Sequence, residues 1–472
     1  MSDKVFLMFD QKWIEPDQKG KKWNGAYRFR VGNLRKDPMP FLKADKPYES
    51  FSTGYASILY DQGLYRLWYE AWDNTYVHDY DGRLCYAEST DSINWRKPVL
   101  GLVEYNGSKD NNIVFDPEMA GKMGFHGSNV FVDPSSPPES RYRMIFGGTL
   151  MKYTNRNEFA LMSMSFAYSA DGLHWKWGIP EKRNWLQPPL TAFGSDTQSV
   201  SFWDDSRQRY VGYFRGLHGE RSVRSIARSE TSEFDRWPHP VTVLVPDDND
   251  EPDTDFYNNA ASRYESGGDS GVFLFISMYN HHTDTLDVQL ATSRDGICFE
   301  RQDRTPLLRN DTETDKGGIY LCPGIITIGK NSMMAYSARE YCHEDGIPGR
   351  TRYGGSYNML RFVKDRLMGL YSDQENEFTL KGFDYAGGAL TVTINAAVNA
   401  GGVIKAGILA GYSMNEYIEG FTMDDCAPVT GDSAALHINW KGGKLSDMEG
   451  SQLRIRFYMK NSVIYSIRVQ NQ

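Results

Sequence analysis

Four acidic residues stand where a carboxyl group can do chemistry. Asp196, Glu49 and Asp255 each lie in a polar segment just before an apolar, strand-like run, and Asp10 lies within the apolar opening of the chain. Cleavage of a glycosidic bond requires two such groups, one protonated to release the leaving oxygen and one ionised as nucleophile or base. We therefore take these four as candidate catalytic residues, with Asp196 first.

Each of these acids also has an ordinary structural interpretation. Asp196 can cap a turn through its own backbone, and Glu49 can be a solvated loop residue. Asp255 directly follows an acidic run of the kind that usually covers a solvated surface. Asp10, and likewise Glu70 in a later apolar run, can occupy the solvent side of a β alternation. The sequence leaves both interpretations open for each residue.

A second set of residues carries side chains that bind sugars. Aromatic faces contact the C–H surface of a sugar, and polar side chains bind its hydroxyls. Seven residues near strand-like runs fit these roles: His126, Asn129, Gln198, Arg215, Tyr257, Trp72 and Glu340, the last followed by Glu344. The alternative for the aromatic residues is a place in the core. For His126, which stands in a glycine-flanked segment, it is a structural hydrogen bond.

Metal and cofactor patterns are weak. His281 and His282 are followed by Asp284 and Asp287, but adjacent residues of a strand point to opposite faces, so the two histidines do not share an ion. The five cysteines are scattered without zinc-binding spacing, and we expect buried thiols in a reducing compartment. No nucleophile elbow, phosphate loop or dinucleotide fingerprint stands between a strand and a helix. We expect no metal and no cofactor.

The elements that position these residues are short β-strands. Helical periodicity is almost absent, whereas alternating runs rich in Tyr, Phe, Val and Ile recur between Gly, Asp, Asn and Pro. A signature of strand, tight turn and aromatic residue repeats at 86–95, 168–175, 227–237 and 291–299. In this signature Asp and Gly supply the turn, and the aromatic residue folds back onto the next sheet.

A matching pair of strands precedes each signature, and a fifth pair follows the last one. The predicted pairs are 54–60 with 64–69, 127–132 with 141–146, 198–203 with 209–214, 260–264 with 272–276, and 324–329 with 332–336. Five such units predict an all-β protein with a five-bladed β-propeller over residues 1–370, including an N-terminal strand and arm over 1–50. Small-residue strands over 375–472 predict a C-terminal β-sandwich.

Composition and charge exclude several classes of partner. The 472 residues carry a net charge of -9, and the basic residues alternate with acids, which argues against binding to nucleic acid. No run approaches the roughly 20 apolar residues that span a bilayer. The chain begins with a strand-like run and no signal peptide, so we expect a cytoplasmic location and no membrane partner, with export open if a leader has been removed. The sequence predicts no oligomeric state.

Most of the chain carries a resemblance to a known family. The run 454–465, preceded by Asp425, Cys426, Gly431, Asp432 and Trp440, and the opening run 7–15 resemble bacterial proteins related to glycoside hydrolase family 32, and more distantly family 43. The resemblance implies a propeller, a sandwich and a carbohydrate substrate. The Asn-Asp-Pro-Asn, Arg-Asp-Pro and Glu-Cys motifs of family 32 do not occur here, so the resemblance assigns no catalytic triad.

Three functions are compatible with these features. The first is a glycoside hydrolase or transglycosidase that cleaves a furanoside or short oligosaccharide with paired carboxylates at the propeller mouth. The second is a carbohydrate-binding protein with the same fold and no reaction. The third is a polysaccharide lyase or phosphorylase, in which Tyr257 or His126 is the base or arginines hold phosphate. The acids at the strand starts favour the first.

Overall fold

The computed structural model describes most of the chain, and strands dominate it. The described residues are 2–16, 27–75, 80–120, 124–149, 162–178, 193–343, 354–411, 416–443, 445 and 448–471. Short 3-10 helices stand at Gln11–Trp13 (η1), Pro47–Glu49 (η2) and Pro138–Ser140 (η3). The prediction of an all-β protein is confirmed. Within the described ranges, no helix is long and apolar enough to cross a membrane.

Three sheets follow one another along the chain, each a four-stranded antiparallel meander. The first contains β5 (Ser52–Asp61), β6 (Leu64–Trp72), β7 (Arg83–Ser89) and β8 (Ile113–Phe115). The second contains β9 (His126–Val132), β10 (Tyr142–Thr149), β11 (Met162–Ser169) and β12 (Lys176–Trp177). The third contains β13 (Val200–Asp204), β14 (Arg209–His218), β15 (Val223–Thr231) and β16 (Val241–Leu244).

A fourth sheet of ten strands consists of two antiparallel groups. The first group contains β17 (Thr254–Asn259), β18 (Ser262–Ser266), β19 (Asp269–Asn280) and β20 (Thr285–Ser293). The second contains β21 (Gly318–Leu321), β22 (Ile326–Ile328), β23 (Asn331–Arg339) and β24 (Ser356–Val363). A parallel bridge between Leu286 and Gly318 joins the groups. The short strands β3 (Arg35–Lys36) and β4 (Leu42–Lys43) pair with β24, so the N-terminal arm completes the second group.

The predicted strand pairs and turn signatures appear in the structure. All five predicted pairs are antiparallel neighbours. In the first signature the Asp91 carboxylate accepts hydrogen bonds of 2.8 Å from the backbone N–H groups of Ile93 and Asn94. An aromatic residue of the preceding sheet also reaches the next signature, since the Trp68 indole N–H donates to the Gly172 carbonyl at 2.6 Å. The repeated signature therefore links consecutive sheets.

Apolar clusters lie between consecutive sheets and connect the last group of strands back to the first sheet. One cluster combines Trp68 with Met144, a second Ile145 with Phe214, a third Val211 with Leu274, and a fourth Met333 with Ile58. A further cluster contains residues of β19, β20, β21, β23 and β24. The packing thus proceeds from each sheet to the next and returns to its start.

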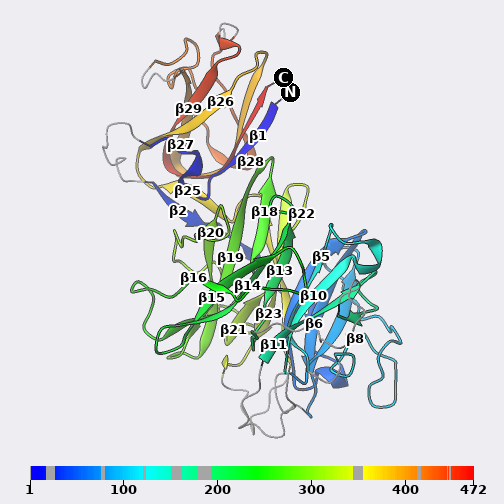
Figure 1. The fold of residues 1–472 in the computed structure, drawn as a ribbon. Helices are drawn as coiled ribbons and strands as arrows, with labels where there is room; N and C mark the ends of the chain where they lie inside the picture. The colour runs from blue at the N-terminus through cyan, green and yellow to red at the C-terminus, as the bar shows by residue number, and fades with distance from the viewer. Residues whose placement is uncertain are drawn as a thin grey trace.

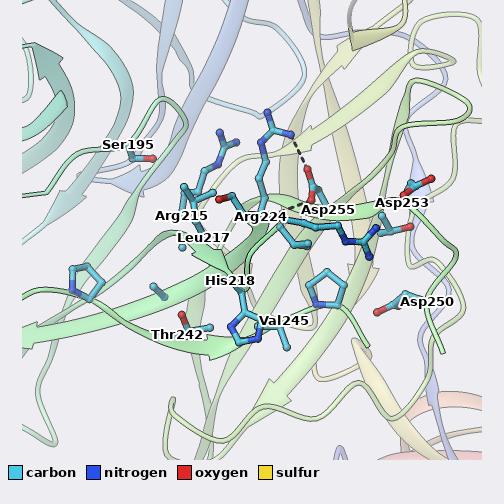
Figure 2. A pocket seen from close by; sticks show the side chains of 18 of the residues that line it. Ser195, Arg215, Leu217, His218, Arg224, Thr242, Val245, Asp250, Asp253 and Asp255 are labelled. Carbon is cyan, nitrogen blue, oxygen red and sulfur yellow. Dashed lines mark hydrogen bonds and ion pairs between the residues drawn. The ribbon is translucent and has the colours of Figure 1, made fainter. Parts of the chain in front are cut away.

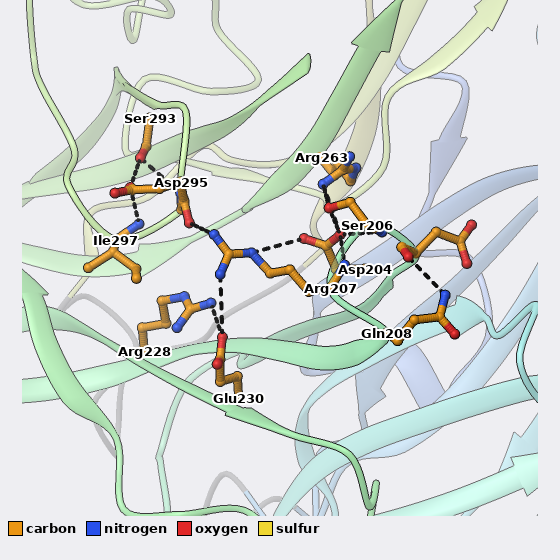
Figure 3. A network of polar contacts seen from close by, with 12 residues as sticks. Asp204, Ser206, Arg207, Gln208, Arg228, Glu230, Arg263, Ser293, Asp295 and Ile297 are labelled. Atoms are coloured by element: carbon orange, nitrogen blue, oxygen red, sulfur yellow. Dashed lines mark hydrogen bonds and ion pairs between the residues drawn. The ribbon is translucent and has the colours of Figure 1, made fainter. Parts of the chain in front are cut away.

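Polar contacts reinforce the junction between the third sheet and the ten-stranded sheet (Figure 3). Arg207, in the β13–β14 turn, donates to the Asp295 carbonyl at 2.6 Å. Arg263 of β18 binds the Asp204 carboxylate of β13 at 2.9 Å. Both arginines cross from one sheet to the other, so they hold the two sheets in a fixed register.

A seven-stranded sheet forms a second body, which Figure 1 shows above the others with both chain ends on it. Its strands are β1 (Ser2–Leu7), β2 (Tyr27–Val31), β25 (Met368–Ser372), β26 (Asn376–Asp384), β27 (Leu390–Ala410), β28 (Gly431–Ile438) and β29 (Gln452–Asn471). β27 and β29 pair along most of their length, with a shift of register between Val398 and Val403. Each long strand contains a residue at positive φ, Gly401 (75°) in β27 and Asn461 (42°) in β29, so neither is extended throughout.

The N-terminal strand lies in a different sheet from the one that the sequence analysis gives it. β1 pairs antiparallel with β29, from Ser2 opposite Asn471 to Leu7 opposite Ser466, and β2 pairs with β25. β1 and β2 therefore belong to the C-terminal sheet, which corrects their assignment to the unit 1–370. The reason is that an apolar alternation predicts a strand but does not identify its partner.

The cysteines differ in their exposure. Cys85, Cys322 and Cys426 are buried, whereas Cys342 is half-buried and Cys298 is exposed, and none forms a disulfide. The prediction of buried thiols is therefore wrong for Cys298. Its backbone N–H binds the Asp295 carboxylate at 2.8 Å, which places it in the solvent-facing turn of the fourth signature.

Asp269 connects the two bodies of the molecule. Its side chain is 1% exposed and accepts hydrogen bonds from the Leu7 N–H at 2.9 Å and from the Trp13 indole N–H at 2.7 Å. It also forms ion pairs with Lys12 and Arg294, and Arg294 in turn holds Asp10 through two hydrogen bonds of 2.7 and 2.8 Å. A buried carboxylate with this many donors is stable only as the anion.

Replacing Asp269 with asparagine should destabilise the fold by about 2–4 kcal/mol, because the buried donors lose their charged acceptor. Urea unfolding of the full chain measures this change in free energy. Glu313→Gln is the matched control, since Glu313 is 91% exposed and pairs only with Lys316 at the surface. A loss for Asp269→Asn no greater than that of the control would contradict the proposed role.

Candidate active site

A large pocket opens at the ends of the third sheet and of β17. Its volume is about 1300 Å³, and it is lined by segments 193–196, 215–224 and 239–255 together with Met162, Ala227 and His281. Figure 2 shows Arg215 from β14, Arg224 from β15 and Asp255 from β17 around this space. Two of the four candidate catalytic acids, Asp196 and Asp255, line the pocket.

Asp196 faces an arginine inside the pocket. The Arg215 guanidinium pairs with the Asp196 carboxylate, whose side chain is 44% exposed. Burial tends to raise the pKa of Asp196, but the positive charges of Arg215, His126 and Arg224 outweigh it and hold the pKa below its usual value. Asp196 is therefore ionised at neutral pH while remaining open to a ligand.

Arg215 is itself held in place by Tyr257. It donates to the Tyr257 carbonyl at 2.7 and 3.2 Å, and its guanidinium lies 4.5 Å from the centre of the Tyr257 ring. The Arg224 guanidinium lies 5.4 Å from the same ring. The face of the Tyr257 ring attracts the positive charges of both guanidinium groups, so Tyr257 orders the two arginines.

Asp255 is the centre of a second polar group. It accepts hydrogen bonds from the Arg224 backbone at 3.0 Å and from the Arg224 guanidinium at 2.7 Å, and it lies 2.9 Å from His281 Nε2. Burial tends to raise its pKa, but the hydrogen bonds from His281 and Arg224 outweigh this and lower the pKa. The His281 side chain is 44% exposed. The arrangement is a carboxylate–imidazole pair with the imidazole open to the pocket.

His126 does not line the pocket but contacts the backbone of Asp196. Its Nε2 is 3.0 Å from the Asp196 carbonyl, and its Nδ1 is 3.1 Å from the Glu70 carboxylate. Glu70 also accepts the backbone N–H groups of Gly127 and Ser128 at 3.1 and 2.6 Å. Because a carbonyl can only accept, Nε2 must carry a proton, and His126 fixes the backbone at Asp196. Trp72 is buried beside the His126 ring, with ring centres 5.7 Å apart.

Gln198 and Asn129 are buried between sheets. The Gln198 amide donates to the carbonyls of Ala56 and Ser128 at 3.0 and 2.7 Å, which connects the first three sheets. The side-chain amide oxygen of Asn129 accepts a hydrogen bond from the Ser201 backbone N–H at 2.8 Å. Both side chains form hydrogen bonds between neighbouring sheets, and neither lines the pocket.

The remaining predicted residues lie elsewhere. Glu49 is buried and accepts hydrogen bonds from Tyr69 at 2.6 Å and from the ammonium of Lys97 at 2.7 Å. Asp10 lies at the junction of the two bodies, paired with Arg294. Glu340 is exposed after β23 and does not line the pocket. Glu344 lies outside the described residues.

Arg224 and His281 are pocket residues that the sequence analysis did not select as ligands of a substrate. Arg224 reaches the pocket because the β14–β15 hairpin pairs Leu217 with Arg224, a register that the turn residues alone do not specify. His281 was considered only for metal binding. It directly follows β19, two residues beyond Tyr279, which pairs with Asp255 on the neighbouring strand β17. Among the described residues, no group of three or more His, Cys, Asp or Glu can hold a metal ion.

Comparisons with known proteins find similarity at the level of structure. No family model and no curated protein matches the chain. A glycosyl hydrolase from Bacteroides ovatus has a TM-score of 0.48 at 13% identity, covering 74% of this chain and 96% of its own. A thermostable family-43 glycoside hydrolase has a TM-score of 0.45 at 13% identity, covering 71% and 96%. The catalytic domain of a Coprinopsis cinerea family-62 α-L-arabinofuranosidase has 0.45 at 12%, covering 71% and 98%. These neighbours are glycoside hydrolases.

One carboxyl close to the pocket has a raised pKa. Burial raises the pKa of Asp287, on β20, to about 6; the positive charge of Arg309 opposes the shift and the negative charge of Glu251 adds to it. Glu251 lines the pocket, but Asp287 does not. The protonation of Asp287 is therefore coupled to the stability of the sheet that contains β20.

Asp287→Asn should stabilise the protein at neutral pH. A carboxyl whose pKa is raised on folding favours the folded state at low pH, and this contribution is lost as the pH rises through about 6. The asparagine carries no charge, so its advantage over Asp287 should grow from almost nothing near pH 4 to about 1–3 kcal/mol at pH 7. Urea unfolding of both proteins across this range measures the difference, and a difference independent of pH would refute it.

Proposed function

We propose that this chain is a glycoside hydrolase or transglycosidase that acts in the pocket between Asp196 and Asp255. The observation that carries the proposal is the meeting of two carboxylates from adjacent sheets around Tyr257 in one large pocket. The substrate is a furanoside or a short oligosaccharide, whose size suits a volume of about 1300 Å³. Arg215 and Arg224, which line the pocket, bind its hydroxyls.

The scaffold that we propose is a five-bladed β-propeller with a C-terminal β-sandwich. Three separate meanders and the two groups of the ten-stranded sheet supply five units of strands. The apolar clusters between them return to the first sheet, which is the packing of a closed ring of blades. The seven-stranded sheet supplies the sandwich.

The mechanism divides the roles between Asp196 and His281. Asp196 is held ionised by Arg215, so it serves as the nucleophile at the anomeric carbon or as the base that takes a proton from the attacking water. Asp255 is also ionised, so it does not supply the proton that the leaving oxygen needs. Protonated His281, oriented by Asp255, donates that proton instead.

Asp196→Asn should lower the rate of hydrolysis about 100-fold or more, because an amide neither attacks the sugar nor accepts a proton from water. Release of product from a panel of aryl glycosides and oligosaccharides measures the rate. Glu313→Gln, on an exposed surface away from the pocket, should keep the wild-type rate. Unchanged hydrolysis by Asp196→Asn would mean that the catalytic carboxylate is elsewhere.

His281→Gln tests the proton donor separately. The rate should fall about 100-fold or more, because glutamine cannot release a proton to the leaving oxygen. In Asp255→Asn the rate should fall by a smaller factor, because the asparagine oxygen can still accept a hydrogen bond from His281 but carries no charge. The kcat of the three proteins on an aryl glycoside measures both effects. An unchanged kcat in His281→Gln would exclude this residue as the acid.

A second candidate function is carbohydrate binding without catalysis. The observation that favours it is that Asp196 and Asp255 are both paired with arginines, so neither carboxyl retains a proton. Calorimetry with the same oligosaccharides distinguishes the two functions. Binding without any release of reducing ends supports the binding function, and turnover of any sugar excludes it.

A further inference from the structure

A second pocket lies between the C-terminal sheet and the ten-stranded sheet. Its volume is about 830 Å³. Residues of β2, β25, β27, β28 and β29 line one side, and residues of β22, β23 and β24 line the other. No lining residue is shared with the candidate active site, so the two pockets are separate.

The two pockets differ in charge. The lining of the second pocket contains the four arginines Arg30, Arg35, Arg361 and Arg366, and Asp432 is its acidic residue. The lining of the first contains three arginines and seven carboxylates. A basic pocket in a chain of net charge -9 attracts anions locally, whereas the first pocket repels them.

Two of the four arginines are committed to the protein. Arg361 binds the Asp37 carboxylate at 2.8 and 3.1 Å. Arg366 binds Asn395 at 2.7 Å and Asp432 at 2.5 Å. These two arginines shape the wall of the pocket, and their donors are already occupied.

Arg30 differs from these two arginines in its contacts. Its guanidinium lies 3.5 Å from the centre of the Tyr371 ring, which holds it flat against the wall. The residue is exposed, and its side chain has no hydrogen bond or ion pair with another described residue. Arg35, whose side chain is 75% exposed, is 3.7 Å from Asp37. Arg30 thus has unoccupied guanidinium donors in the lining of the pocket, and their forked arrangement matches a carboxylate or sulfate.

We infer that this second pocket binds an acidic saccharide, with Arg30 as the principal ligand of its carboxylate or sulfate group. A pocket of about 830 Å³ is much larger than a single inorganic anion. The amide side chains of Asn331 and Asn399 line it as well, and such groups bind sugar hydroxyls. The inference does not depend on catalysis in the first pocket.

Calorimetry on the full chain tests the inference with four probes: trigalacturonate, a sulfated trisaccharide, neutral maltotriose and inorganic sulfate. At least one of the two acidic trisaccharides should bind, and whichever binds more tightly identifies the anionic group. The binding should weaken as sodium chloride rises from about 50 to 300 mM, because salt screens the ion pair. Maltotriose and sulfate should bind at least about tenfold more weakly.

Arg30→Ala should weaken binding of the acidic trisaccharide about tenfold or more, since a hydrogen-bonded ion pair is lost. The affinity of Arg30→Lys should lie between those of the wild type and Arg30→Ala, because lysine keeps the charge but not the planar fork. Arg236→Ala is the control, since Arg236 is 69% exposed and pairs with Glu233 away from both pockets. Thermal unfolding checks that each variant is folded.

Several outcomes would overturn the inference. These are no binding of either acidic trisaccharide, equal binding of maltotriose, sulfate binding as tightly as the saccharides, and affinity unchanged in Arg30→Ala. Because none of these readouts uses hydrolysis, failure here leaves the proposed function of the first pocket unaffected. Loss of hydrolysis in Asp196→Asn, in turn, says nothing about Arg30.

Discussion

The amide of Gln198 is the interaction on which the site most depends. The inner strands β5, β9 and β13 approach one another but do not form a continuous backbone ladder. A buried backbone carbonyl without a partner is costly, and the Gln198 side chain supplies partners to Ala56 and Ser128 at once. Asp196 is two residues away, so the same bonds that join three sheets also fix the segment that carries Asp196 into the pocket.

Several charged groups around the pocket are paired with groups of opposite charge. Glu70 holds His126, His126 holds the Asp196 backbone, and Arg215 holds the Asp196 side chain. Asp255 joins Arg224 to His281 in the same way. A buried charge is tolerated only with such a partner, and each pairing also settles which group is ionised. These pairings keep Asp196 and Asp255 ionised and leave the His281 imidazole open to the pocket.

Much of the fold could be predicted from the sequence, because strands and tight turns are local features. Alternating apolar residues gave all five strand pairs, and Asp91 occupies its turn as its signature predicts. The partner of a strand is not local. The apolar run of β1 therefore identified a strand, but its pairing with β29 depends on contacts across the whole chain.

The site was only partly predictable for the same reason. Asp196 and Glu49 look alike in sequence, as acids before an apolar strand, but Lys97 and Tyr69 enclose Glu49 while Asp196 stays open. The sequence gives no signal for the contact of His281 with Asp255, because the carboxylate lies 26 positions earlier on another strand.

The pairing of β1 with β29 also affects how the chain reaches this structure. It joins Ser2 to Asn471, and closing so long a loop is slow because many conformations must be given up first. During synthesis β1 leaves the ribosome long before β29 exists. Until then its apolar residues, Val5, Phe6 and Leu7, belong to a strand without its partner, which is an edge that other nascent chains can join. β1 thus waits for its partner longer than any other strand of that sheet.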